Sequence, residues 1–374
     1  MTQPGYHDAV NDALERMADL GYERGVGADL ANHGPMGAEA LAVLGYGADV
    51  AGWVERYRVA VPHHEPPEPR FPIDAADESD WRGALGRFER AGDWERLFQR
   101  ELAGHDWTSV LARWWPRLLP GMFAGLTHGL IRTAHAARAL HAADAPTALQ
   151  LTELARGLAY WAARYRELPG RPGLHGTQSV AEAVAALPRE PADGPLGPAT
   201  GHRRLARLPE FPGYERALTA LAPDRAHALL SRMTTQFADV YLGHPEVFPV
   251  PLVHGVTAPA AARLVLPLLP EETYERTLAV LWQVHTALLL VFTGDHGGEG
   301  GGAWRETYPD VPGFGELAAR AAEHGDEHVI KFTEACRREH ALRPDPRYPA
   351  AALAAQQRIA PQQSDAAGRY PGAG

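Results

Sequence analysis

Apolar residues recur at helical spacing along most of the chain. The strongest example is residues 271–292, where one face carries Leu278, Leu281, Trp282, His285, Leu288, Leu289 and Phe292. No segment shows the convincing alternation of apolar and polar residues that is typical of a half-buried strand. The pattern therefore predicts an all-α fold.

Further helices are expected wherever this spacing resumes between turn-forming residues. They are predicted at residues 7–22, 36–46, 50–59, 178–187, 214–221, 223–242, 314–323 and 326–340, with two long helices between residues 121 and 167 that are separated near residues 143–146. Residues 249–257 are predicted to be extended, because Pro249 and Pro251 stiffen them. Thr257 is then expected to cap the next helix, with Pro259 in its first turn.

Residues 78–118 are unusually rich in tryptophan. They hold five of the nine tryptophans, namely Trp81, Trp94, Trp107, Trp114 and Trp115. Large aromatic side chains in this number predict the core of several short packed helices. A wall on which an aromatic substrate stacks is the alternative.

The helices are expected to form one large domain over residues 1–360, joined by loops rich in proline and glycine. Residues 168–198 are rich in both, so they are either a surface excursion or the seam between two lobes. The glycine-rich residues 294–302 are predicted to be a mobile lid or a linker, since they do not fit a phosphate-binding motif. Residues 361–374 are expected to be a disordered tail.

Charge and composition argue against several kinds of partner. A formal charge of −10 at pH 7 disfavours nucleic acid. The single cysteine, Cys336, excludes an intramolecular disulfide and a thiolate metal cluster. The N-terminus lacks a signal pattern, and the longest apolar run, residues 278–292, is too short to span a membrane. We therefore expect a cytoplasmic protein that binds neither nucleic acid nor a membrane.

Lys331 is the only lysine among the 36 basic residues of the chain. Because arginine is used wherever the two are interchangeable, the one lysine is a candidate for chemistry that arginine cannot perform. A buried lysine can lose its proton, and the neutral amine can add CO₂ to form a carbamate, which is an anionic oxygen ligand. The alternative is a surface ion pair with Glu327, one helical turn earlier.

The chain contains 18 histidines, and without a cysteine framework any metal site must use imidazole and oxygen ligands. Four histidines occupy positions suited to presenting a ligand, namely His33, His128, His254 and His328. The first precedes a helix, the second lies in the apolar helix 121–132 between two glycines, and the third follows the proline-stiffened segment. His328 lies three residues before Lys331 and projects from the same helix face. A capping histidine is the alternative for His33, and a buried structural histidine is the alternative for His128.

Three further residues are candidates for chemistry. Arg132 and His135 share the face of His128, one and two turns further along, where they could orient a phenolate or transfer a proton. His285 lies on an apolar stripe, where a core histidine bonded to a backbone carbonyl competes with a role in a site. Residues 324–328 formally match the zinc-protease pattern H-x-x-E-H. A helix start predicted inside that motif argues against it.

Four stretches of the sequence resemble the questin oxidase-like family. They are Asn32-His33-Gly34-Pro35 with the segment that follows to Ala48, His128-Gly129-Leu130-Ile131, Val253-His254-Gly255-Val256-Thr257, and Asp326-Glu327-His328-Val329-Ile330-Lys331. They occur in the expected order over nearly the whole chain. The chain departs from the more histidine-rich fungal members after the first motif, where it has Pro35, Ala38 and Glu39, so its substrate need not be questin.

The resemblance implies an oxygenase of aromatic polyketide biosynthesis. Such an enzyme opens a ring of an anthraquinone-type substrate with O₂, by carbon–carbon cleavage or a Baeyer–Villiger-like insertion. The resemblance further implies a mononuclear non-haem Fe(II) held by the histidines at positions 33, 128, 254 and 328, with a carboxylated Lys331 as an oxygen ligand. Arg132, His135 and His285 then become candidate catalytic residues, and NADPH is an optional reductant.

Two other functions stay open at this point. One is a metal-free, NADPH-dependent oxygenase whose histidines perform acid–base chemistry. The other is a non-catalytic helical scaffold within a biosynthetic complex, in which the four histidines would be scattered in space. The sequence leaves the oligomeric state open, with a homodimer as one option.

Overall fold

The computed structural model describes residues 5–26, 30–191, 198–295 and 298–362. In this part of the chain there are 18 α-helices and one pair of two-residue strands, so the predicted all-α fold is confirmed. Most of the predicted disordered tail, from residue 363 onward, lies outside the described residues.

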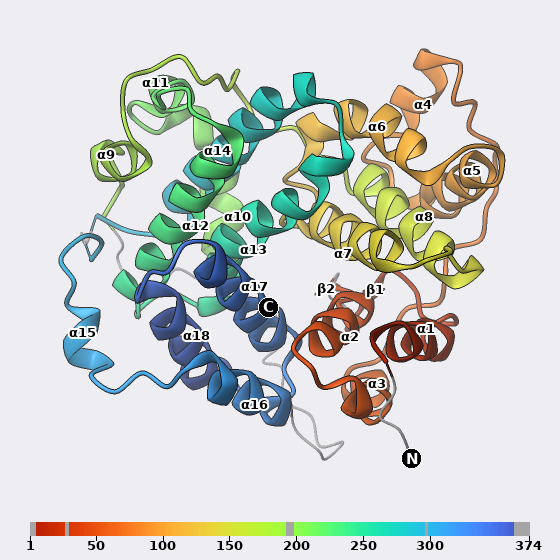
Figure 1. Cartoon of the computed structure of the whole chain (residues 1–374). Coiled ribbons are helices and arrows are strands. Elements are labelled where there is room, and N and C mark those ends of the chain that lie inside the picture. The colour runs from red at the N-terminus through yellow and green to blue at the C-terminus, as the bar shows by residue number, and fades with distance from the viewer. Residues whose placement is uncertain (1–4, 27–29, 192–197, 296–297, 363–374) are drawn as a thin grey trace.

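The first half of the chain forms one group of helices, drawn in red to yellow-green in Figure 1. Its helices are α1 (Tyr6–Arg16), α2 (Gly34–Val43), α3 (Val50–Ala60), α4 (Glu78–Ala84), α5 (Ala91–Gly104), α6 (Trp107–Leu118), α7 (His128–Ala142) and α8 (Ala148–Ala163). The antiparallel strands β1 (Glu23–Arg24) and β2 (Leu30–Ala31) precede α2.

The second half forms a second group, drawn in green to blue. Its helices are α9 (Val180–Ala186), α10 (Pro198–Ala206), α11 (Tyr214–Ala217), α12 (Ala226–Gly243), α13 (Pro249–Val265), α14 (Tyr274–Phe292), α15 (Trp304–Thr307), α16 (Phe314–His324), α17 (Glu327–Leu342) and α18 (Arg347–Arg358). Short 3₁₀ turns join or extend helices at Gly47–Asp49, Phe88–Arg90, Leu119–Gly121, Leu208–Glu210, Leu266–Leu268 and Glu271–Thr273.

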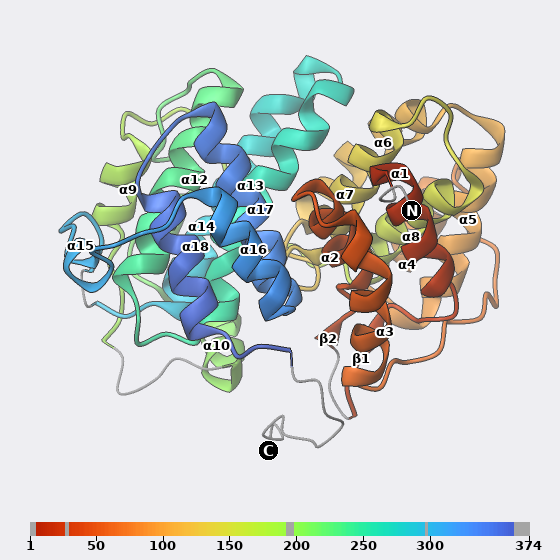
Figure 2. The same cartoon turned by 60° about the horizontal axis from the view of Figure 1, so that its bottom comes forward.

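The two groups meet along α2, α7, α13 and α17. Helix α17 packs against α2 and α13, and α13 packs against α7. Figure 2 shows α2 and α7 facing α17 and α13 across the middle of the molecule. One buried apolar cluster includes side chains from both groups, from Tyr22 to Ile359. The interface between the two groups of helices is therefore part of the protein core.

The tryptophan-rich segment forms core, as its composition predicts. Trp94, Trp114 and Trp115 have no exposed surface, and Trp81 is 3% exposed. The indole N–H of Trp115 donates to Oγ1 of Thr277 at 2.9 Å, which ties α6 to α14. Because these rings are buried, they do not present a stacking wall to a substrate.

Three predictions about local structure were wrong. Residues 249–257 are not extended, because α13 already begins at Pro249. A proline is tolerated in the first helical turn, where its missing N–H would have no partner in any case. Thr257 therefore does not cap a helix, and Pro259 is not in a first turn, because both lie inside α13. The predicted helix 121–132 is also wrong in its first part, because residues 123–127 form turns and α7 begins only at His128.

Contacts with neighbouring residues hold the described part of the glycine-rich loop in place. Glu299 forms an ion pair with Arg189 at 2.5 Å and contacts Nε2 of His244 at 2.7 Å. The backbone N–H of Gly300 donates to Asp239 at 2.7 Å. These contacts favour a fixed loop over the predicted mobile lid.

One segment passes the length and composition test for crossing a membrane. It is Pro249–Leu268, and 83% of its most apolar 18-residue window is buried inside the protein. This burial is typical of a core helix, which passes the same test.

Candidate metal centre

His33 is the residue that immediately precedes α2, as predicted. Its backbone N–H donates to the hydroxyl of Tyr57 at 2.8 Å, and that hydroxyl donates to Oδ1 of Asn32 at 3.0 Å. The same Asn32 oxygen accepts the N–H of Gly34 at 3.0 Å. The buried hydrogen bonds hold the start of α2 in place, and they fix the direction in which the His33 side chain leaves the backbone.

His128 is the first residue of α7. The turn before it places Gly125, Leu126 and Thr127 at φ values of 50°, 55° and 68°. Left-handed backbone is costly for residues other than glycine, so the surrounding structure must hold this turn in place. The turn brings the carbonyl of Gly125 against Nδ1 of His128. The contact between this carbonyl and Nδ1 therefore restrains the orientation of the imidazole.

His254 lies on α13 and is 2% exposed. Its Nδ1 is 3.0 Å from Oγ1 of Thr127, a residue of the left-handed turn. Its Nε2 is buried without a hydrogen-bond partner among the described residues. A buried polar atom of this kind is costly unless something else satisfies it.

His328 and Lys331 project from the first turn of α17. Asp326 caps this helix, since its side chain accepts the N–H groups of His328 at 2.8 Å and Val329 at 3.2 Å. The preceding helix α16 ends at His324, and Gly325 has a φ of 77°. The two histidines of H-x-x-E-H thus lie on different helices, which contradicts a zinc-protease reading of the motif.

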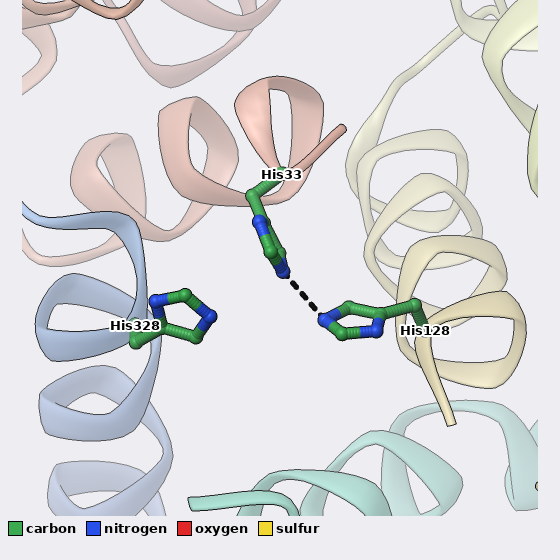
Figure 3. Close-up of side chains that lie close together, drawn as sticks. All are labelled: His33, His128 and His328. Atoms are coloured by element: carbon green, nitrogen blue, oxygen red, sulfur yellow. Dashed lines mark hydrogen bonds between the residues drawn. The ribbon is translucent and has the colours of Figure 1, made fainter. Parts of the chain in front are cut away.

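The structure brings these histidines together from four helices. Nε2 of His33 lies 2.5 Å from Nε2 of His128, and His328 faces the same point from the opposite side (Figure 3). One nitrogen from each of these three rings lies within 4.8 Å of the others, which is a spacing that can hold a metal ion. The ring of His254 is next to that of His128, with centroids 4.6 Å apart.

Nδ1 of each ring lies near an oxygen. It contacts the Gly125 carbonyl in His128 and is 3.0 Å from Oγ1 of Thr127 in His254. In His33 and His328 it is 3.4 Å from Oε1 of Glu327 and 3.3 Å from Oδ1 of Asp326, without the geometry of a hydrogen bond. A carbonyl can only accept, so the Gly125 carbonyl favours the proton of His128 on Nδ1 and the lone pair on Nε2. The carboxylate near Nδ1 of His33 favours the same tautomer, in which the Nε2 atoms of His33 and His128 face each other as acceptors, a contact that a cation between them would relieve.

Burial favours the neutral form of three of the imidazoles. It lowers the pKa of His33, His128 and His254 well below the usual value, and the nearby Lys331 and neighbouring rings lower it further. Metal binding requires the neutral imidazole. These three residues therefore fit a metal ion in both protonation state and donor type.

The comparison with known families agrees with the resemblance in the sequence. A questin oxidase-like family model matches residues 30–183, a range that contains His33 and His128. The chain is similar to the questin oxidase-like family. This confirms the predicted resemblance over that range, and the family suggests an oxidase or oxygenase. His254, His328 and Lys331 lie beyond the matched residues, and no curated protein matches the chain.

Lys331 is buried, which rules out a surface ion pair with Glu327. Burial lowers the pKa of Lys331 to about 7, although Glu327 and Asp326 oppose the shift. In the described part of the chain, no residue forms a hydrogen bond or a close ion pair with its amine. An appreciable fraction of this amine is therefore neutral at neutral pH, which is the form that can add CO₂.

Glu327 is a residue whose contribution to the centre the sequence did not reveal. Its side chain is buried and forms an ion pair with Arg24 of β1. The Arg24 guanidinium also lies over the ring of Tyr57, with 4.5 Å to the ring centroid. Glu327 is held in this way beside the Nδ1 atoms of His33 and His328, at 3.4 Å and 3.9 Å.

Arg132 and His135 are engaged in a separate network and make no hydrogen bond to the four histidines in the described chain. Arg132 forms a two-pronged ion pair with Glu153, at 2.6 Å and 2.8 Å. His135 contacts Glu39 at 2.7 Å, and Arg138 joins Glu39 to Glu334. Both predicted catalytic residues line a small pocket of about 10 Å³, which has room for about one water molecule.

His285 also lies outside the group of four rings. It is fully buried on α14, and its two ring nitrogens face the carbonyls of Leu281 at 2.6 Å and Gly255 at 2.7 Å. A core histidine bonded to backbone carbonyls is what the sequence favoured at this position. Because both nitrogens are engaged, the ring is poorly placed to act as a metal ligand.

Proposed function

We propose that this protein is an oxygenase of aromatic polyketide metabolism that uses O₂ at a mononuclear non-haem iron. In this proposal, it opens a ring of an anthraquinone-type substrate. The main support is the arrangement of four imidazoles whose Nδ1 atoms face oxygens. The family match over residues 30–183 supports the class of reaction. The gathering of the histidines also speaks against a non-catalytic scaffold.

Neutral imidazoles together with one anionic oxygen suit Fe(II) among the common metals. His33, His128, His254 and His328 would supply the nitrogens. Lys331 would supply the oxygen after its neutral amine adds to CO₂, which forms one N–C bond and releases one proton. When bound, the iron would supply the position at which O₂ is activated.

The residues around the proposed centre would control water and protons. The four rings and Lys331 are largely buried, so bulk water has little access to them. Glu327 lies near Nδ1 of His33 and Asp326 near Nδ1 of His328, so each carboxylate would favour a proton on that nitrogen. The Nε2 lone pairs would then be free to bind the metal. An electron-rich hydroxylated substrate would provide the electrons for oxygen chemistry.

The decisive experiment is metal analysis of protein purified without chelators. We expect about one iron per chain in the wild type and a substoichiometric amount in Lys331→Arg, because a guanidinium cannot form a carbamate. His105→Ala is a matched control, since that histidine is exposed and distant in sequence from the four motifs. Full iron content and turnover in Lys331→Arg would contradict the carbamate.

A metal-free protein that still turns over substrate with NADPH would contradict the iron proposal as a whole. The same preparation tests the need for iron and the need for NADPH when turnover of hydroxylated anthraquinones is measured with and without NADPH. Turnover that follows iron content across the single His→Ala variants supports the proposal. We expect the four ligand variants to lose iron and the His105→Ala control to keep it.

A further inference from the structure

Helix α13 contains a proline in its interior, at position 259. In an α-helix, the N–H of each residue donates to the carbonyl four residues earlier. Proline has no N–H, so the carbonyl of Gly255 lacks its usual donor. Gly255 directly follows His254, one of the four histidines of the proposed centre. The gap in the hydrogen-bond ladder therefore falls on the turn that carries a proposed ligand.

The side chain of His285 fills this gap from a neighbouring helix. Its Nε2 lies 2.7 Å from the Gly255 carbonyl, and the residue has no exposed surface. The other ring nitrogen faces the carbonyl of Leu281 at 2.6 Å. Burial lowers the pKa of His285, which favours a neutral ring with one N–H. Both carbonyls can accept this proton, but the Leu281 carbonyl has a backbone donor within α14, whereas the Gly255 carbonyl has lost its helical donor, and this difference favours the proton on Nε2.

Packing leaves little freedom at this point. A Cβ atom added to Gly255 would lie 2.2 Å from Cδ1 of Phe237, so only glycine fits. The Phe237 ring in turn lies against His285, with 3.9 Å between ring centroids. The backbone next to His254 is thus enclosed by Phe237 on one side and bonded by His285 on another.

We propose that His285 is a positioning residue, whose Nε2–H replaces the donor that Pro259 lacks and thereby fixes the turn of α13 that carries His254. His285 acts through the Gly255 carbonyl and does not bind the metal. The fixed turn holds His254 beside the ring of His128, where its Nε2 is buried without a hydrogen-bond partner among the described residues. The inference rests on the proposed metal centre, although the hydrogen bond itself is independent of it.

A double-mutant cycle tests this relationship, because Pro259→Ala introduces the backbone N–H that the Gly255 carbonyl lacks. The variants are His285→Leu, which has no donor, His285→Gln, which keeps one, Pro259→Ala, and the double variant Pro259→Ala/His285→Leu. Thr286→Val is the matched control, since Thr286 is the next residue of α14 and is equally buried. The measurements are the thermal midpoint of the metal-free protein and its affinity for Fe(II) or for Co(II), which is stable in air.

We expect His285→Leu to weaken metal binding about tenfold or more and to lower the thermal midpoint. His285→Gln should retain most of both properties. In the Pro259→Ala background, His285→Leu should lower the metal affinity and the thermal midpoint clearly less, because the helix then supplies its own donor to the Gly255 carbonyl. Thr286→Val should leave metal affinity unchanged. If His285→Leu does not fold, the glutamine and double variants still carry the comparison.

Two results would overturn the inference. The first is additivity, in which His285→Leu lowers the metal affinity and the thermal midpoint equally in the wild-type and the Pro259→Ala backgrounds. The second is coupling in thermal stability without any loss of metal affinity, which would make His285 a packing residue only. If the wild type itself binds no metal, the proposed function fails, while the cycle on thermal stability still decides whether His285 serves the Gly255 carbonyl.

Discussion

Arg24 and Glu327 form a buried ion pair although 303 residues separate them in the chain. Both side chains are 4% exposed. The pair joins the first strand to the start of α17, and it places a carboxylate beside the Nδ1 atoms of His33 and His328. Glu327 thus lies between the positive charge of Arg24 and the two imidazoles.

Glu327→Gln should weaken both the fold and the centre. The substitution removes one partner of a buried ion pair, so the free energy of unfolding should fall, by up to about 3 kcal/mol. Loss of the carboxylate beside His33 should reduce metal affinity about 10- to 100-fold. Denaturant titration and metal titration measure the two effects separately.

Glu339→Gln is the matched control for that variant. Glu339 lies on the same helix and forms a buried ion pair with Arg263 at 2.8 Å. Its loss should destabilise the protein to a similar extent without changing metal affinity. Equal metal affinities in the two variants would show that Glu327 does not serve the histidines.

Uptake of CO₂ by the metal-free protein should depend on pH. The pKa of Lys331 is lowered to about 7, so its amine is neutral above this pH and protonated below it. In ¹³C-bicarbonate, a carbamate signal should grow as the pH rises through about 7 and should be absent from Lys331→Arg. A signal that appears only near the usual pKa of lysine would contradict the neutral buried amine.

Glu39 should contribute to stability in a way that is lost in acid. Burial alone would raise the pKa of Glu39, but Arg138 and His135 outweigh it and lower the pKa to about 2. A carboxyl with a lowered folded-state pKa stabilises the protein above its unfolded pKa, and this contribution disappears as the pH falls toward 2. The loss should amount to about 2–3 kcal/mol. Glu39→Gln should show a shallower decline in unfolding free energy below pH 5.

His135→Asn should retain iron. The imidazole belongs to the network of Glu39 and Arg138, so its loss should lower the thermal midpoint and leave the metal content near that of the wild type. Elemental analysis beside a melting curve separates these outcomes. Loss of iron in a folded His135→Asn protein would show that His135 contributes to the metal centre, although its contacts are with Glu39 and Arg138.

The sequence predicts those parts of the centre that depend on local patterns. The cap at Asp326 and the helix after His33 have local signals, and the isolated lysine has a compositional one. These features are set within a few residues of the chain. The helical spacing of apolar residues likewise predicts most of the fold, because burial of one helix face is a local requirement.

Other parts depend on contacts that no local pattern reveals. The left-handed turn before His128 includes Leu126 and Thr127, residues that rarely adopt this conformation, so the sequence favoured a continued helix. The prolines near His254 suit an extended segment as well as a first helical turn, and packing decides between them. The partner of Glu327 lies in a distant strand, and its identity follows only from the folded chain.

The spread of the four histidines over α2, α7, α13 and α17 has a consequence for biosynthesis. Helix α17 follows α2 by nearly 300 residues, so a growing polypeptide lacks His328 and Lys331 long after His33 and His128 have been made. Metal loading of the proposed centre must then wait until α17 has been synthesised and has packed against α2 and α13, and CO₂ uptake by the lysine must wait as well. Maturation of this protein would therefore depend on the iron and bicarbonate that the folded chain encounters.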